Sequence, residues 1–412
     1  MTLQPRMDWT SALEDMPKAR GVRVVGFVLE RILSFVDRGQ VTIVLPNGVT
    51  LTHVGARPGP CAELRLHRWR ALRRLALKGD LGFAMAYVDG DWSSPDLAAL
   101  IELAAVNDSK FVRAVGGVSP FHLFNWLAHR LKSNTRAGSR RNIMAHYDLG
   151  NDFYRLWLDA KMIYSSAIYD TPQTTLETAQ ERKLRRIAEL LQLNVGNTVL
   201  ELGCGWGALA TRMAEHGARV TGVTLSPAQL EHARHAARDQ GLEAGVDLRL
   251  QDYRDVQGRF DRIVSIEMIE AVGREFLPRY FDLIRRKLKP GGLCVLQAIT
   301  IAEERFPAYC RRPDFIQRYI FPGGFLPSKT LLRETLEKAG LRLASIETFG
   351  DSYALTLNEW RRRFLGAWPE IERLGFPASF RRLWEYYLCY CEAGFRAGVI
   401  DVGLYSVVHG EA

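Results

Sequence analysis

Long apolar segments are absent from this sequence of 412 residues. No run approaches the ~18 consecutive apolar residues of a membrane-spanning helix, so we expect no transmembrane segment. The first residues include Asp8, Glu14 and Asp15, which is unlike the charge pattern of a secretory signal. We therefore expect a cytoplasmic protein.

Cysteine is scarce, and its six residues form neither a disulfide framework nor a zinc-binding pattern. Cys389 and Cys391 are too close in sequence for the usual spacing of zinc ligands. This absence excludes a disulfide scaffold and leads us to expect no metal. The sequence also contains no internal repeat and no low-complexity tract, so a repeat architecture is not expected.

Acidic residues are few in the first third of the chain. Residues 1–142 contain 20 Lys and Arg against 12 Asp and Glu, whereas residues 143–412 contain 35 against 34. Nearly all of the formal net charge of +9 therefore comes from the first third. No nucleic-acid-binding motif accompanies these basic residues, so we predict an anionic membrane surface as the partner and no nucleic acid. Charge that only aids solubility is the alternative.

The Gly-rich stretch at residues 199–207 is the feature around which the rest is organised. It has the pattern of a strand, a turn with three glycines and the start of a helix. The spacing E-x-G-x-G-x-G differs from the G-x-G-x-x-G of NAD enzymes, and a phosphate-binding Lys-Ser/Thr is missing. The pattern is similar to the first motif of Rossmann-type S-adenosylmethionine (SAM) methyltransferases. A Gly-rich turn in another α/β protein is the alternative.

Strand-like and helix-like segments alternate from this stretch onward. This alternation predicts a doubly wound, parallel α/β sheet whose ligand lies outside the carboxyl ends of the strands. The first predicted strand starts at residue 199, and the following strands cover residues 219–224, 246–250, 260–266 and 293–297. The predicted helices cover residues 175–193 and 208–216.

The first third has different patterns, and we predict a smaller α+β domain there. Asn47-Gly48 between two β-rich runs predicts a hairpin at residues 41–54. Helical patterns occupy residues 20–36 and 95–106, and residues 111–131 form an apolar arm with few charges. The Arg-rich segment at residues 65–78 is either a basic amphipathic surface or an ordinary solvated face. The predicted domains are residues 1–130, a basic lipid-binding or membrane-binding domain; residues 131–142, a polar linker; and residues 143–412, a catalytic domain.

Several motifs together resemble the cyclopropane-fatty-acyl-phospholipid synthases and the related mycolic-acid and fatty-acid methyltransferases. They are HYDLGNDFY (146–154), YSSA (164–167), LELGCGWG (200–207), GVTLSPAQ (222–229), QDYRD (251–255), EMIEAVG (267–273), YIFPGG (319–324) and FGDSY (349–353). The resemblance runs from about residue 146 to residue 408 and more loosely through the first third. It implies a Rossmann-like SAM-methyltransferase sheet.

The resemblance also implies which residues contact SAM. These are Tyr164, Ser165, Glu201, Gly203, Gly205, Thr224, Leu225, Gln229, Asp252 and Tyr253. Many such folds place an acid at the end of the second strand to hold the ribose. No acid follows that strand here, so Thr224 or Gln229 is expected to take this role.

A bound bicarbonate ion acts as the general base in the family that the sequence resembles. The matching residues here are Ser166, Glu270, Gln297, Tyr353 and Cys391 as catalytic residues, with a backbone contact from Ile299. Many members have Cys at position 166, His at 297 and His at 271, where this chain has Ser, Gln and Ala. A hydroxyl and an amide still hydrogen-bond an anion. Glu270 is either the direct base or the residue that orients bicarbonate.

We predict methyl transfer from SAM to the cis double bond of an unsaturated phospholipid acyl chain, giving a cyclopropane. A methyl-branched or methylene chain is the first alternative, and a small-molecule N- or O-methyltransferase is the second. A lipid-binding protein without activity is disfavoured because Gly203 and Gly205 are both present. The expected protein is a homodimer at the cytoplasmic face of the inner membrane.

Overall fold

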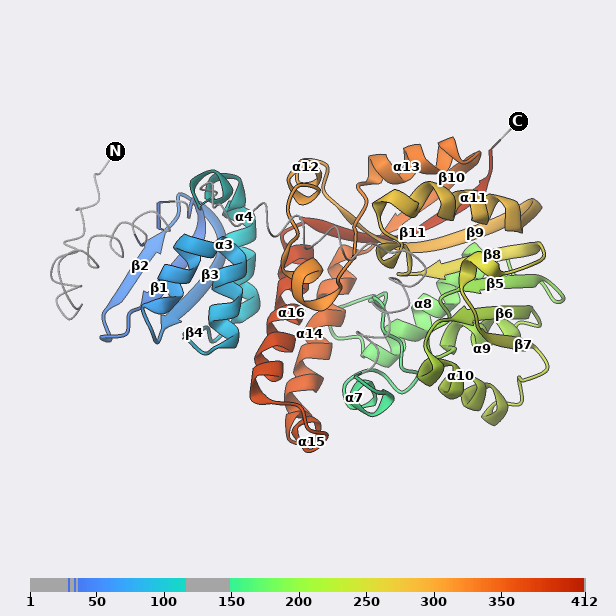
Figure 1. Ribbon diagram of the computed structural model, residues 1–412, viewed down its shortest axis with the longest axis horizontal. Coiled ribbons are helices and arrows are strands. Elements are labelled where there is room, and N and C mark those ends of the chain that lie inside the picture. The colour runs from blue at the N-terminus through green and yellow to red at the C-terminus, as the bar shows by residue number, and fades with distance from the viewer. Residues whose placement is uncertain (1–28, 30–32, 35, 116–148, 411–412) are drawn as a thin grey trace. The chain divides into compact units, whose positions relative to one another are not determined.

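The computed structural model describes residues 29, 33–34, 36–115 and 149–410. The chain divides into two compact units, each with its own sheet (Figure 1). Unit 1 comprises Met1–His122 and Pro377–Ala397, and unit 2 comprises Leu123–Phe376 and Gly398–Ala412.

Unit 1 has a four-stranded sheet in the order β2-β1-β3-β4. Its elements are β1 (Arg38–Val44), β2 (Thr50–Val54), β3 (Arg57–Leu66), α3 (Arg70–Val88), β4 (Trp92–Ser93), α4 (Leu97–Val115) and α16 (Ala378–Arg396). Trp92 is buried, stacks on Phe83 at 4.4 Å between ring centroids, and donates its indole N–H to the Phe83 carbonyl. The large ring and its satisfied N–H anchor the apolar core of this unit.

The predicted hairpin is confirmed. β1 and β2 pair antiparallel with Val44 opposite Thr50, and Gly48 in the turn has φ +85°. Only glycine adopts this backbone conformation without steric cost, which explains the strength of the Asn-Gly signal. Of the helix predicted at residues 20–36, residues 29, 33, 34 and 36 are described; the first three are helical, and residue 36 is not. The linker predicted at residues 131–142 lies outside the described residues.

Helix α16 packs on α3 and α4 and belongs to unit 1. Sequence analysis assigned its residues to the catalytic domain because they are far from the first third along the chain. Arg382 of α16 donates to the carbonyls of Tyr87 and Trp92, and its guanidinium lies 4.5 Å from the centre of the Tyr87 ring. The Tyr87 hydroxyl in turn donates to Glu385. Such side-chain pairings between distant segments leave no local sequence signal.

Unit 2 has a seven-stranded sheet in the order β10-β11-β9-β8-β5-β6-β7. Its strands are β5 (Thr198–Leu202), β6 (Arg219–Thr224), β7 (Val246–Leu250), β8 (Phe260–Ile266), β9 (Leu288–Ile301), β10 (Leu341–Thr348) and β11 (Ile400–His409). Strands β5 to β9 run parallel, and β11 is antiparallel to both β9 and β10. The predicted doubly wound sheet is confirmed.

Alternate residues of the central strands enter two separate cores, one on each face of this sheet. Leu200 and Ile263 point into the core with α11 and α13, whereas Val199 and Val264 point into the core with α8, α9 and α10. This period of two places helices on both faces (Figure 1). The helices of unit 2 are α7 (Asn151–Arg155), α8 (Leu176–Leu190), α9 (Ala208–Glu215), α10 (Pro227–Asp239), α11 (Leu277–Lys287), α12 (Phe306–Tyr309), α13 (Lys329–Lys338), α14 (Gly350–Gly366) and α15 (Trp368–Arg373).

Candidate functional site

The Gly-rich turn joins β5 to α9 at the carboxyl edge of the sheet. Gly203, Gly205 and Gly207 all have positive φ, at +81°, +51° and +88°. A Cβ on Gly207 would approach the Ala233 Cβ to 2.8 Å, whereas a Cβ on Gly205 would meet nothing within 4 Å. Glycine at 207 therefore permits close helix packing, and glycine at 205 leaves open space beside the first N–H groups of α9. This space suits a polar ligand such as the amino-acid part of SAM.

Side chains at the ends of three neighbouring parallel strands complete the predicted cofactor edge. Glu201 of β5 is buried, its Oε2 has no hydrogen-bond partner, and burial raises its pKa to about 8. The Thr224 hydroxyl of β6 donates to Gln229 Oε1 at 2.9 Å. Asp252, after β7, accepts two hydrogen bonds from the Arg254 guanidinium at 2.8 and 2.6 Å. The remaining predicted residues at this edge, Leu225 and Tyr253, directly follow Thr224 and Asp252 in sequence.

The YSSA segment lies between an aromatic cluster and a buried lysine. The Tyr164 ring lies 5.3 Å from the Tyr154 ring and 5.2 Å from the Trp360 ring, measured between centroids. The Ser165 hydroxyl accepts a hydrogen bond from Lys183 Nζ at 2.6 Å. Tyr164 and Ser165 are thus held from two sides.

The structure brings Ser166, Gln297 and Tyr353 together around one carboxylate, and this carboxylate belongs to Glu267. The Ser166 N–H donates to Glu267 Oε1 at 2.8 Å, and Gln297 Nε2 donates to the same oxygen at 2.7 Å. The Tyr353 hydroxyl donates to Oε2 at 2.6 Å. Glu267 is not among the residues predicted from the sequence, although this acid directly follows β8.

Two details of this cluster differ from the sequence-based expectation. The Ser166 hydroxyl was expected to hold an anion, but it donates to the Ala167 carbonyl, and only the Ser166 backbone N–H reaches the carboxylate. The FGDSY motif suggested a loop at Tyr353 from its Gly-Asp-Ser sequence, but Tyr353 lies in the first turn of α14. An unbroken helical pattern after FGDSY was the signal for this second difference.

Glu270 occupies the 3-10 turn that follows β8 and holds a second carboxylate in the site. Its Oε1 accepts a hydrogen bond from the Ile299 N–H at 2.6 Å, and its buried Oε2 has no partner. Burial, and then the negative charge of Glu267, raise the pKa of Glu270 to about 8. Ile299 was predicted to contact bicarbonate, whereas in the structure its N–H binds Glu270.

Lys183 is a residue that sequence analysis missed. It is 1% exposed, and burial lowers its pKa to about 8, whereas the charges of Glu267 and Asp159 oppose this change. The burial of Lys183 could have been predicted from the sequence, because Lys183 lies on the apolar face of α8, one turn before Ile187. A buried lysine beside a carboxylate supplies the positive charge that stabilises the ionised acid.

Cys391 is the one predicted catalytic residue outside unit 2. It is half-buried in α16, which belongs to unit 1. Among the described residues, no group of three or more His, Cys, Asp and Glu side chains is arranged to hold a metal ion. None of the described helices is long and apolar enough to cross a membrane.

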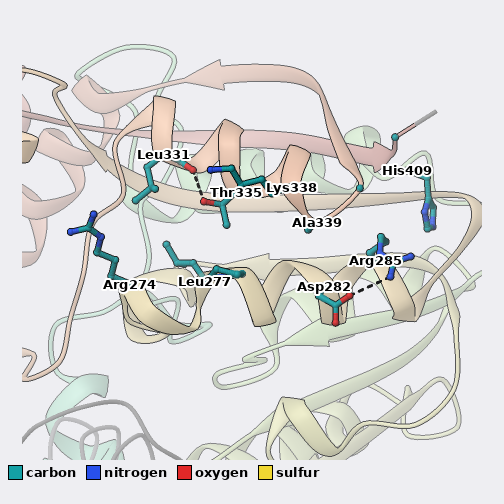
Figure 2. Close-up of a pocket in the computed structure, with 12 residues that line it drawn as sticks. Arg274, Leu277, Asp282, Arg285, Leu331, Thr335, Lys338, Ala339 and His409 are labelled. Carbon is teal, nitrogen blue, oxygen red and sulfur yellow. Dashed lines mark hydrogen bonds and ion pairs between the residues drawn. The ribbon is translucent and has the colours of Figure 1, made fainter. Parts of the chain in front are cut away.

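A groove of about 800 Å³ lies elsewhere in unit 2, between α11 and α13. Figure 2 shows Leu277 and Leu331 on the two facing helices, with His409 at one end. Asp282 in this groove is already paired with Arg285. None of the residues of the Glu267 cluster lines the groove, so it is separate from the candidate active site.

The sequence matches a known family and several of its members. The family model described as mycolic acid cyclopropane synthetase matches residues 134–404. Tuberculostearic acid methyltransferase UfaA1 of Mycobacterium tuberculosis is 39% identical over 370 residues, covering 87% of this chain and 86% of the relative. Cyclopropane-fatty-acyl-phospholipid synthase of Escherichia coli K12 is 38% identical over 360 residues, covering 84% and 87%.

Solved structures agree with this assignment. Mycolic acid cyclopropane synthase CmaA1 in complex with SAH and CTAB aligns with a TM-score of 0.62 and 32% identity, covering 65% of this chain and 97% of that structure. The space beside Gly205 and the polar residues at the strand ends fit a SAM molecule. The chain therefore belongs to the mycolic acid cyclopropane synthetase family and is a SAM-dependent methyltransferase.

Proposed function

We propose that this enzyme transfers the methyl carbon of SAM to the cis double bond of an unsaturated acyl chain in a membrane phospholipid. The observation that carries the proposal is the pair of carboxylates, Glu267 and Glu270, at the carboxyl edge of the sheet. Alkene methylation leaves a carbocation that must lose a proton, so it needs a negative charge and a proton acceptor. A small-molecule N- or O-methyltransferase needs no such pair.

The first step forms a bond between the methyl carbon and one alkene carbon and breaks the bond between that methyl group and sulfur. The neighbouring alkene carbon becomes cationic. Tyr164, Trp360 and Tyr353 form a chain of rings in unit 2, with 5.2 and 6.1 Å between successive centroids. Aromatic faces attract a cation, and a fixed carboxylate does so more strongly in a site that excludes water.

The surroundings of the two carboxylates differ in how well they stabilise a negative charge. Burial raises the pKa of Glu267 above its ordinary value, while Tyr353, the Ser166 N–H and Lys183 act in the opposite direction. Burial and the charge of Glu267 raise the pKa of Glu270 to about 8, and its Oε1 accepts a hydrogen bond from the Ile299 N–H. Glu267 therefore has more groups around it that stabilise a carboxylate anion. We assign the base to Glu267 and not to Glu270.

Two products are compatible with this chemistry. If the proton leaves the transferred methyl group, its C–H electron pair closes a cyclopropane ring, which is the product expected from the family. If a hydride first shifts to the cationic carbon, the cation moves to the carbon that bears the methyl group: loss of a proton from that methyl group then gives a methylene chain, and loss from a chain carbon gives an unsaturated methyl-branched chain. The 39% identity to a tuberculostearic acid methyltransferase supports this second candidate. Bicarbonate as the base remains the family-based alternative to Glu267.

The test uses SAM with a fully deuterated methyl group and vesicles of a monounsaturated phospholipid. Mass spectrometry of the acyl chains should show two deuterium atoms on the transferred carbon for a cyclopropane or a methylene chain and three for an unsaturated methyl-branched chain; ozonolysis, which cleaves a methylene double bond and leaves a cyclopropane intact, separates the first two. Absence of any label in the lipid, with label transferred to an amine or hydroxyl compound, would favour the N- or O-methyltransferase.

We also propose that unit 1 associates with the anionic surface of the membrane and that the enzyme works there as a homodimer. The basic side chains of Arg68, Arg70 and Arg74 gather around the buried carboxylate of Asp91. Arg74 also pairs with Asp89, so three guanidinium groups face two carboxylates and the cluster keeps one net positive charge. This surplus supports a location at the cytoplasmic face of the membrane.

A further inference from the structure

We propose that Glu267 is a built-in replacement for the bicarbonate ion, so that the methyl transfer proceeds without any bound small anion. The inference rests on the proposed function, because it assigns the proton acceptor of that reaction. It concerns one side chain, and it separates this enzyme from relatives that need a free anion as the base.

The hydrogen-bond donors of the site are already used by protein carboxylates. Two N–H donors, from Ser166 and Gln297, and one O–H donor, from Tyr353, converge on Glu267. Ile299 N–H, the remaining donor expected to contact bicarbonate, binds Glu270. A bicarbonate ion at this position would have to compete for every one of these donors, and it would meet the negative charge of Glu267.

The backbone of Glu267 supports the same conclusion independently. Its φ is +48°, in the left-handed region that a residue with a side chain rarely adopts. Glycine would occupy this position without strain. The backbone of Glu267 is strained, and three hydrogen bonds hold its side chain in the candidate active site. This combination indicates that the function requires the carboxylate.

A buried lysine acts on the carboxylate of Glu267. Lys183 on α8 is buried, and its charge interacts with Glu267 and Asp159. Glu270 is a further titratable group in this region, and its charge acts on Tyr280, Tyr309 and Tyr405 of the surrounding elements. The ammonium group of Lys183 therefore favours the anionic form of Glu267.

The proton transfer balances without a further reactant. After methyl transfer, either a C–H bond of the transferred methyl group breaks and its electron pair forms the third ring bond, or a C–H bond on a carbon adjacent to the cation breaks and its electron pair forms a double bond. The proton goes to a carboxylate oxygen of Glu267, which then returns it to solvent before the next turnover. Nothing is oxidised or reduced.

The first experiment compares turnover in buffer depleted of carbon dioxide with turnover in the same buffer plus bicarbonate. Wild-type turnover should be unchanged by bicarbonate. Glu267→Gly, which removes the strain and frees three donors, should lose at least ~10-fold without bicarbonate and recover with it, because a general base contributes ~10²-fold or more. Glu267→Gln should lose ~10²-fold without recovery, because the amide still fills the space.

The matched control is Gln192→Gly. Gln192 also has φ +48° but is exposed on a turn after α8, so this substitution gives the same backbone relief away from the site. It should leave turnover and its independence of bicarbonate unchanged. A wild-type enzyme that needs bicarbonate, or a Glu267→Gly variant as active as wild type without it, would overturn the proposal.

A binding experiment keeps this inference separate from the proposed function. Bicarbonate should raise the melting temperature of Glu267→Gly in a saturable manner and leave that of the wild type unchanged, because only a folded-state site stabilises. This readout needs no lipid substrate, so it stands even if phospholipid turnover fails. An equal shift in the wild type and in Glu267→Gly would overturn the replacement. If Glu267→Gly does not fold, the wild type and Glu267→Gln decide the proposal. A rise in the melting temperature of the wild type with bicarbonate would overturn the replacement. An unchanged melting temperature, together with an inactive Glu267→Gln variant, would support it.

Discussion

Glu267 and Glu270 both follow β8 closely, yet their surroundings differ. Three donors and a buried lysine stabilise the anion of Glu267, whereas Glu270 has the Ile299 N–H and, among the described residues, a buried oxygen without a partner. Like charges at close range disfavour the ionisation of both acids. At the scale of single residues, the site therefore stabilises a negative charge on Glu267 better than on Glu270.

Glu270→Gln tests the protonated state of Glu270. The pKa of Glu270 is about 8 in the folded protein, against an ordinary value of 4.5. The folded state binds more protons between these values, so the free energy of unfolding falls as pH rises from about 4.5 to about 8. Glu270→Gln removes this decrease in the free energy of unfolding, because the amide does not ionise. Its melting temperature should exceed that of the wild type by on the order of a few degrees above pH 8, with no excess near pH 4.5.

Turnover of the same variant distinguishes the two carboxylates. Because the amide resembles the protonated acid, Glu270→Gln should lose less than ~10-fold at pH 7, whereas Glu267→Gln should lose ~10²-fold. SAM affinity, measured by calorimetry, should be nearly unchanged in both variants. The reverse order of the two losses would return the base to Glu270, as the sequence first suggested.

Lys183→Met tests the electrostatic support of Glu267. Without the buried ammonium, the pKa of Glu267 should rise, because one of the groups that lower it is gone. The acid limb of the plot of kcat/KM against pH should then move upward by on the order of one pH unit. A variant that has merely lost packing would show lower turnover at every pH, with the limb in its original position.

At the scale of elements, much of unit 2 was predictable. The strands at residues 219–224, 246–250 and 260–266 were found with the bounds that the structure has, because apolar strands between helices give a strong periodic signal. The convergence of Ser166, Gln297 and Tyr353 was implied by the family resemblance. The carboxylate at their centre was not, because a left-handed residue with a side chain leaves no pattern in the sequence.

The Gly-rich turn gives a prediction at this scale. Gly205→Val should abolish SAM binding, because the side chain would enter the open space beside α9. The fold should persist, since a Cβ at this position meets no atom within 4 Å. Gly241→Val is the matched control, with φ +67° and equally open surroundings on the surface. Calorimetry should show SAM binding in the control and none in Gly205→Val, and equal affinity in both would contradict the assignment.

At the scale of the whole molecule, the excess of Lys and Arg is concentrated in the first third of the chain. Residues 143–412 are almost neutral, and the first third carries the surplus of Lys and Arg. The pairing of α16 with α3 and α4 shows why the division was only partly predictable. Helix α16, near the end of the chain, belongs to unit 1 because it packs on α3 and α4 and because Arg382 donates hydrogen bonds to Tyr87 and Trp92. Both interactions join residues that are far apart in sequence.

The charge of unit 1 predicts salt-sensitive binding to anionic vesicles. Exposed charges are screened over ~8 Å at physiological ionic strength, so the attraction should weaken as salt is added. In a flotation assay at low salt, the wild type should be found in the floating fraction with anionic vesicles and in the bottom fraction with neutral vesicles. Reversing two exposed charges of α3, Arg73→Glu with Lys78→Glu, should reduce flotation several-fold, since each basic residue near the surface contributes about 1 kcal/mol.

The matched control makes the same change of net charge in unit 2, with Arg333→Glu and Lys338→Glu on α13, where both residues are exposed. If unit 1 is the membrane-binding surface, this control should float nearly as well as the wild type, although the total charge of the two variants is equal. An equal loss in both variants would mean that overall charge, and not the surface of unit 1, governs association. Flotation with neutral vesicles that is insensitive to salt would exclude an electrostatic role altogether, and the apolar surface would then have to supply the affinity.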